Sequence, residues 1–239
     1  MTTLPEELII LALDVEKGTV GRSSTTKEII TYALTAGILM ELMLAERIRV
    51  EKPPKKFFTF KTPHGTVTVT DPTLTGDEIL DDALTRIQSR GKIKGAFYWI
   101  DKLGPVTAAR DSSLIDWSGK GSRFLARLAQ QGVVIKKEHH TLGVISTPRF
   151  KLMDPSLRQE LHERLDLSLA PGALPERRQV MLAALVRVCR LFGDLYPDGK
   201  RRHEAQDRAA ALQQADIEVD FLCGEIQKVK ASHDTAVYT

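Results

Sequence analysis

A long apolar stretch near the start of the chain constrains the fold more than any other feature. Between Ala33 and Ala45 apolar residues occupy nearly every position, and Thr35 and Glu41 are the only polar interruptions. A helix that is apolar on almost every side has to lie among other elements, and a charge inside it needs a partner. A bilayer-spanning helix takes about 20 predominantly apolar residues, so this stretch is too short to cross a membrane. The sequence therefore predicts a helical bundle built around a buried central helix.

Capping signals predict further helices around the central one. A Ser or Thr followed three residues later by Glu can satisfy two unpaired backbone donors at a helix start. This spacing occurs at Thr3 and Glu6, at Thr25 and Glu28, and at Thr75 and Glu78. Asp154-Pro155 supplies the favoured N-cap and first residue of another helix. Apolar periodicity predicts the other helices at residues 97–103, 111–131 and 175–192, with two more within 200–230.

Short β-rich stretches predict one strand and two hairpins beside these helices. The predicted strands are residues 47–51, 57–61, 66–70, 133–137 and 144–149. Pro63-His64-Gly65 favours a turn in the first hairpin, and the turn of the second is expected around residues 139–143. We expect a mainly α fold that forms one domain over residues 1–239, with a frayed tail from about residue 231.

Composition and charge exclude several classes of protein. A chain of 239 residues with 42% hydrophobic residues can bury a substantial core. Its formal net charge of +3 permits an anionic partner but is far below that of chains devoted to nucleic acid. Met1 leads directly into a helix cap with no secretion signal, and Cys189 and Cys223 lie in apolar helical patterns. We therefore expect a cytoplasmic protein with two buried thiols, and a disulfide between them is the alternative.

Motifs that suggest catalysis or metal binding are better explained as structural features. The four aspartates between residues 71 and 82 lie near a helix start, where acidic side chains complement the helix dipole. Gly119-Lys120-Gly121-Ser122 lacks the upstream glycine and the preceding strand of a phosphate loop. His139 and His140 are neighbours, so they point apart on a strand, and no second ligand pair follows. We expect no catalytic activity, no metal site and no cofactor.

Four blocks of sequence carry a family resemblance. They are Leu4-Pro5-Glu6-Glu7-Leu8, Ala36-Gly37-Ile38-Leu39-Met40-Glu41-Leu42, Thr75-Gly76-Asp77-Glu78-Ile79-Leu80-Asp81-Asp82-Ala83-Leu84 and Leu128-Ala129-Gln130-Gln131-Gly132-Val133. In this order and at these intervals they resemble the Golgi phosphoprotein 3 family over residues 4 to about 230. Without an extended N-terminal tail, the chain is most similar to the bacterial branch of that family. The resemblance implies a mostly helical fold around a central bundle, a projecting β-hairpin with an apolar tip, and membrane binding through phosphatidylinositol 4-phosphate, as in eukaryotic members.

The resemblance carries over only part of the family's lipid site. Eukaryotic members use a tryptophan, an arginine in the central helix, and two arginines before the hairpin. By alignment these positions hold Thr26, Thr35, Ser118 and Gly121, none of which is aromatic or charged. Hydroxyls alone would hold a headgroup phosphate much more weakly than guanidinium groups.

Other basic residues nearby could bind a headgroup instead. The candidate headgroup residues are Arg22, Lys27, Lys120 and Arg123. The glycines beside Lys120 would let backbone amides approach an anion where a helix begins or resumes. The alternative is that these charges are simply solvated, as is usual at loops and helix ends.

The second predicted hairpin combines apolar and basic residues. Leu142, Val144 and Ile145 lie near its turn. Its arms carry the cations Lys136, Lys137, Arg149 and Lys151. An apolar tip with basic arms is what a shallow membrane anchor requires. Packing of the hairpin on its own core, or on a second copy in a homo-oligomer, is the alternative.

We therefore expect a noncatalytic peripheral membrane protein that binds anionic phospholipids, phosphatidylinositol 4-phosphate by resemblance, and that could also bind protein cargo. A winged-helix nucleic-acid-binding protein is the main alternative, because residues 122–149 have a helix, strand, turn, strand order with Arg123 and Arg127 on the helix. Nucleic acid is disfavoured by the modest charge and the few base-reading residues. A protein-binding adaptor without lipid affinity is the third possibility.

Overall fold

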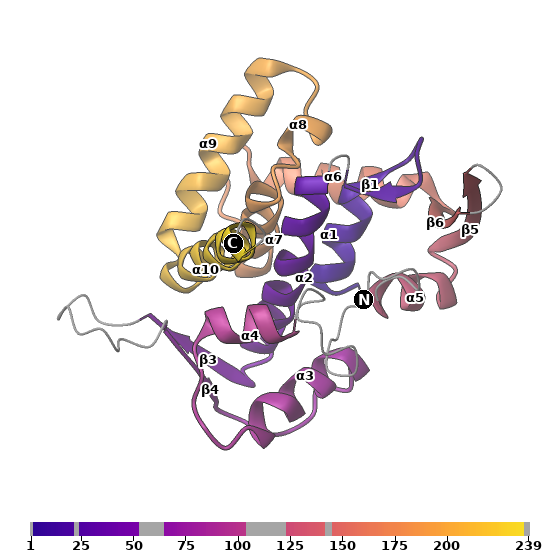
Figure 1. Cartoon of the computed structure of the whole chain (residues 1–239). Coiled ribbons are helices and arrows are strands. Elements are labelled where there is room, and N and C mark those ends of the chain that lie inside the picture. The colour runs from indigo at the N-terminus through magenta and orange to yellow at the C-terminus, as the bar shows by residue number, and fades with distance from the viewer. Residues whose placement is uncertain (1, 22–23, 53–64, 104–122, 142–144, 237–239) are drawn as a thin grey trace.

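Helices dominate the protein, as the sequence predicts (Figure 1). The structure is a computed structural model that describes residues 2–21, 24–52, 65–103, 123–141 and 145–236. Within these ranges the helices are α1 (Leu4–Ala12), α2 (Ser24–Leu44), α3 (Glu78–Ser89), α4 (Ala96–Leu103), α5 (Arg123–Gln130), α6 (Pro155–Ser168), α7 (Arg177–Val188), α8 (Phe192–Leu195), α9 (Gly199–Ala215) and α10 (Ile217–Ala236). The strands are β1 (Leu13–Asp14), β2 (Thr19–Val20), β3 (Ile48–Glu51), β4 (Thr66–Val69), β5 (Val134–Thr141) and β6 (Ile145–Leu152).

The buried central helix is α2. It packs against α1, α4, α7 and α10, which surround it in Figure 1. Its residues from Ile30 to Leu39 lie inside the core, among them a fully buried Tyr32. Its interior charge has the partner that burial demands, because Glu41 accepts hydrogen bonds from Arg178 Nη1 at 2.8 Å and from the Leu4 backbone nitrogen. Among the described residues no helix is both long and apolar enough to cross a membrane.

Of the four predicted helix starts, two are confirmed, and two are wrong because α2 already begins at Ser24, before the predicted cap Thr25, and α3 has another cap. Glu6 accepts a hydrogen bond from the Thr3 backbone nitrogen at 2.8 Å, and Asp154 caps α6 through the Ser156 nitrogen at 2.8 Å. The N-cap of α3, however, is Asp77 rather than Thr75. A carboxylate two residues further along the chain can accept from two free amides of the first turn, so it displaces the hydroxyl as the cap.

The strands form three two-stranded antiparallel sheets in the described residues. The β5–β6 hairpin pairs from Val134 opposite Leu152 to Thr141 opposite Ile145. Each strand begins one residue later than predicted and extends beyond its predicted C-terminal end, so β5 covers residues 139–141, which the sequence predicts in the turn. β4 pairs with β3, so residues 66–69 use the strand at residues 48–51 as their partner. The strand predicted at 57–61 lies outside the described residues. In Figure 1 the β5–β6 hairpin projects from the side of the bundle, as the resemblance implies.

The C-terminal helices close the other side of the core. The helix predicted over 175–192 is α7, which ends earlier, at Val188. Arg190 follows in the left-handed region at φ 57°, and the separate short helix α8 begins at Phe192. α10 continues to Ala236, beyond the fraying expected from residue 231, because His233 Nε2 lies 2.6 Å from Asp101 Oδ1 of α4. Both cysteines are buried free thiols, and burial raises the pKa of Cys223 to about 12.

Candidate functional site

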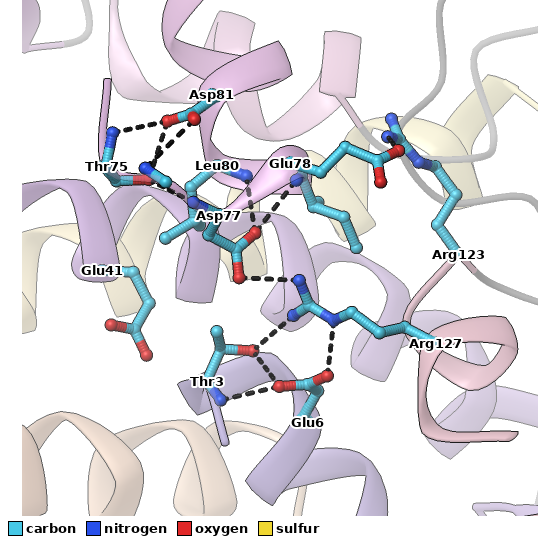
Figure 2. Close-up of polar contacts among 12 residues, drawn as sticks. Thr3, Glu6, Glu41, Thr75, Asp77, Glu78, Leu80, Asp81, Arg123 and Arg127 are labelled. Atoms are coloured by element: carbon cyan, nitrogen blue, oxygen red, sulfur yellow. Dashed lines mark hydrogen bonds and ion pairs between the residues drawn. The ribbon is translucent and has the colours of Figure 1, made fainter. Parts of the chain in front are cut away.

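Two arginines of α5, the helix that directly precedes the β5–β6 hairpin, form ion pairs with the body of the protein. Arg127 Nε lies 2.7 Å from Glu6 Oε1 of α1, and its Nη1 lies 2.6 Å from Asp77 Oδ2 at the start of α3 (Figure 2). The Glu6 side chain is only 2% exposed, so this carboxylate depends on the guanidinium for its charge balance. Burial lowers the pKa of Arg127, but its bonds to Glu6 and Asp77 outweigh that effect and raise it.

Arg123, at the first position of α5, is held by carboxylates of α3. Its Nη1 lies 2.6 Å from Asp82 Oδ2 and its Nη2 lies 3.0 Å from Glu78 Oε1. Burial raises the pKa of Asp82, but hydrogen bonds and charge from Arg86 and Arg123 lower it below the usual aspartate value overall. An anionic ligand at Arg123 would therefore compete with Asp82 and Glu78 for the guanidinium.

The aspartates between residues 71 and 82 have structural roles, as we interpreted them from the sequence. Asp77 caps α3 by accepting from the Ile79 nitrogen at 2.9 Å, and Asp81 accepts from Thr75 Oγ1 at 2.7 Å (Figure 2). Asp71 forms an ion pair with Arg47 at 2.7 Å. No group of histidine, cysteine and carboxylate side chains in the described ranges could hold a metal ion.

The two faces of the β5–β6 hairpin differ sharply near its base. Side chains alternate along a strand, so Val134, Phe150 and Leu152 share the face that packs on the core, and all three are buried. The opposite face is solvent-facing and basic. It carries Ile135, Lys137, Arg149 and Lys151.

The turn between β1 and β2 is bonded to the outer edge of this hairpin. The Phe150 backbone nitrogen donates to the Gly18 carbonyl at 2.7 Å, and Arg149 Nη1 donates to the Lys17 carbonyl. Gly18 has φ 65°, and a Cβ there would lie 3.0 Å from the Phe150 carbonyl oxygen, so only glycine fits this close approach without strain. We call this contact between Gly18 and Phe150 the clasp. It holds the hairpin at a defined angle to the bundle.

A shallow basic groove of about 360 Å³ lies between the turn and the hairpin. We call it the hairpin groove. Its cations are Lys17, Lys137, Arg149 and Lys151, and its only acidic side chain is Glu16. None of the four cations forms an ion pair with a carboxylate in the part of the chain that the structure describes. The exposed Val15 adds an apolar side chain at the rim.

The sequence-predicted site residues are described only in part. Lys27 is exposed near the start of α2, and Arg123 makes the ion pairs given above. Arg22, Lys120, Leu142 and Val144 lie outside the described residues, and Ile145 begins β6 opposite Thr141. Thr35, at which the resemblance predicts no basic group, is fully buried and donates to the Thr31 carbonyl at 3.4 Å.

Sequence reasoning identified the cations on the hairpin arms but missed the turn that completes the groove. Lys17-Gly18 was the available signal, because a glycine after a lysine marks a tight turn with an exposed cation. Nothing local indicates that this turn would pack against a strand far along the chain.

Comparison with known protein families gives one match. The family model described as Golgi phosphoprotein 3 (GPP34) matches residues 4–229, which is nearly the whole chain. None of the curated proteins matches this chain.

Proposed function

The chain belongs to the Golgi phosphoprotein 3 family, and we propose that it is a noncatalytic, cytoplasmic protein that associates peripherally with membranes by binding anionic phospholipid headgroups. The hairpin groove is the observation that carries this proposal. Four cations that no described carboxylate neutralises converge there, three on the hairpin that projects from the bundle and one, Lys17, on the β1–β2 turn bonded to it. Basic residues close to a membrane each contribute about 1 kcal/mol of attraction to an anionic surface.

The hairpin would supply two weak signals that act together. Its cations attract the headgroup layer, and the apolar residues at the tip, Leu142, Val144 and Ile145, enter the layer just beneath it. One weak signal gives only reversible contact with a bilayer, whereas two in combination anchor a protein stably. The exposed Ile135 lies on the same face as the cations and extends the apolar contact along the strand.

The lipid would be recognised by charge more than by headgroup identity. Thr35 is buried and bonded to the backbone, so it offers no donor to a phosphate. Lys27 and Arg123, with Arg22 and Lys120, stay candidates for a headgroup contact, with Asp82 and Glu78 as competitors at Arg123. We therefore propose binding to anionic lipids in general, with phosphatidylinositol 4-phosphate as one member of that class.

Vesicle sedimentation tests the lipid class. Vesicles of phosphatidylcholine alone are compared with vesicles that also contain phosphatidylserine or phosphatidylinositol 4-phosphate at equal total charge. We expect sedimentation with both anionic compositions and its loss at high salt, because exposed charges are screened. Absence of binding to either anionic composition would overturn the proposal, and binding to phosphatidylinositol 4-phosphate alone would show that a specific site survives.

A pair of apolar-to-acidic substitutions tests the tip. Leu142→Asp with Val144→Asp should abolish sedimentation and leave the melting temperature unchanged. The matched control is Leu174→Asp with Ile217→Asp, whose parent side chains are 98% and 66% exposed on other elements. Unchanged sedimentation of the tip variant would contradict insertion. A fall in its native molecular mass would favour the homo-oligomer alternative.

The winged-helix alternative has less support than the sequence alone indicates. Both arginines of its candidate recognition helix, Arg123 and Arg127, are engaged by carboxylates. A gel shift with nonspecific duplex DNA at low salt tests for nucleic-acid binding. A shift that persists in Lys137→Glu would support the winged-helix alternative.

A further inference from the structure

A second basic cleft lies between α3 and α4, on a different part of the molecule from the hairpin. It has a volume of about 500 Å³ and opens to solvent. We call it the α3–α4 cleft. Its cations are Arg86 of α3, Arg90 at the C-cap of α3, Lys92 of the connecting segment and Lys102 of α4, and no acidic side chain lines it. Figure 1 shows α3 and α4 at the opposite end of the bundle from α8 and α9, while β5 and β6 project to one side.

The charge of this region is concentrated well above that of the chain. Residues 86–102 contain five cations and one carboxylate, whereas the whole chain carries a net charge of +3. The carboxylate is that of Asp101, whose Oδ1 lies 2.6 Å from Nε2 of His233. Arg86 is paired with Asp82, but Arg90, Lys92 and Lys102 form no ion pair with any described residue. Such a concentration of uncompensated charge is costly to the fold and favours an anionic partner.

The cleft has an aromatic and apolar floor. Tyr98, Trp99 and Leu103 line it, and Arg90 and Lys94 both lie 5.2 Å from the centre of the Tyr98 ring. These contacts hold the two cations against the ring, so less side-chain freedom is lost when they meet a carboxylate. They also occupy the ring that a nucleic-acid base would need for stacking.

A smaller cleft continues on the other side of the segment that carries Lys92. It has a volume of about 310 Å³ and shares Lys92 and Trp99 with the α3–α4 cleft. Its apolar lining includes Val67 and Val69 of β4 and Ile87 of α3, beside the polar Thr68, Gln88 and Lys94. The exposed Ile93, 67% accessible, stands at this boundary. The two clefts together therefore offer basic contacts and apolar contacts within one continuous region.

From this arrangement we propose that the α3–α4 cleft binds an acidic peptide segment of a partner protein, one in which Asp and Glu alternate with Leu or Phe. A single phosphate would reach only one or two of the cations, because they come from two helices and the segment between them. A bilayer is flat at this scale, so it could not contact the floor of a cleft. An extended chain reaches both the cations and the floor, and carboxylates are complementary to the lining.

Binding of a short fluorescent peptide rich in Asp, Glu, Leu and Phe to the full-length protein tests the proposal by anisotropy, with the Asn and Gln version of the same peptide as control. Lys92→Glu with Lys102→Glu should weaken binding about tenfold or more, because two attractions become repulsions. The matched variant is Lys137→Glu with Lys151→Glu in the hairpin groove, which changes the net charge equally and should leave peptide affinity within about twofold.

A second readout uses Trp99, which lines the cleft. In a Trp117→Phe background Trp99 is the only tryptophan, and saturating peptide should change its emission. No binding of the acidic peptide, or equal losses in the two double variants, would overturn the proposal. The protein could instead bind a DNA oligonucleotide or anionic vesicles more tightly than the peptide. If only Lys92→Glu with Lys102→Glu removed that binding, the proposal would be overturned in favour of that ligand. Failure of vesicle binding at the hairpin would leave this outcome unaffected, because the cleft and the groove share no residues.

Discussion

The arginines of α5 and the lysines of the hairpin that follows it belong to one helix–hairpin unit yet have opposite surroundings. Arg127 forms ion pairs with the buried Glu6 and the half-buried Asp77, so its charge is neutralised within the fold. Lys137 and Lys151 are exposed and have no carboxylate partner among the described residues. The difference teaches that basic residues in one supersecondary unit divide into those that attach it and those that remain available to an outside partner.

Of the substitutions that test this comparison, removal of the Arg127 side chain should have the largest effect, and that effect is on the free energy of unfolding. Arg127→Ala leaves Glu6 buried without its counter-charge, and we expect a loss of about 3 kcal/mol of unfolding free energy. Chemical denaturation measures it. The matched variant is Arg123→Ala, which should cost about 1 kcal/mol or less because Glu78 is 88% exposed and Asp82 is 30% exposed. Equal losses in the two variants would refute the assignment of Arg127 as the attachment point.

Charge reversal at the hairpin should act on binding and leave stability intact. Lys137→Glu replaces an attraction with a repulsion, so affinity for anionic vesicles should fall by about 2 kcal/mol, roughly thirtyfold. The melting temperature should stay the same, since no described residue loses a partner. Lys200→Glu on α9 makes the same change at another exposed lysine and should bind like the wild type. Loss of vesicle binding in both variants would show that only net charge matters.

Glu7 provides a case in which burial outweighs the neighbouring arginine. Burial raises the pKa of Glu7, and the charge of Arg178, 3.5 Å away, offsets it only in part. A carboxyl whose pKa is higher in the folded state binds its proton more tightly there, so stability falls as pH rises through that range. Glu7→Gln should therefore stabilise the protein at pH 7 by on the order of 1 kcal/mol. In denaturation at pH 4 the gain should shrink, and an equal gain at both pH values would contradict this reading.

Asp82 should give the smallest effect, with the opposite pH dependence. Its pKa is lowered overall by Arg86 and Arg123, so it stabilises the fold above the ordinary aspartate pKa and loses that contribution as pH falls. Asp82→Asn should cost about 0.5 kcal/mol at pH 7 and almost nothing in strong acid. The same variant leaves Glu78 as the remaining carboxylate partner of Arg123, so vesicle binding should rise if that guanidinium contacts a headgroup. Unchanged binding would remove Arg123 from the candidate residues.

The central helix is predictable from sequence because its apolar residues leave no solvent-facing side, and the partner of Glu41 follows from the cost of burying a charge. The cap of α3 is less predictable, since Thr75 and Asp77 both satisfy the local rule and only the structure ranks them. The hairpin arms follow from alternation, but the hairpin groove does not. It depends on Gly18 meeting Phe150, a contact between distant segments that no periodicity records.

The clasp at Gly18 also determines how the protein would sit on a membrane. A hairpin joined to the bundle only through its two ends could rotate relative to it. Membrane insertion of its tip would then leave the orientation of the rest of the molecule undetermined. The backbone bond from Phe150 to Gly18 ties the hairpin to the segment between α1 and α2. An anchored tip therefore sets the tilt of the whole bundle above the lipid surface, and with it the direction in which every other face points.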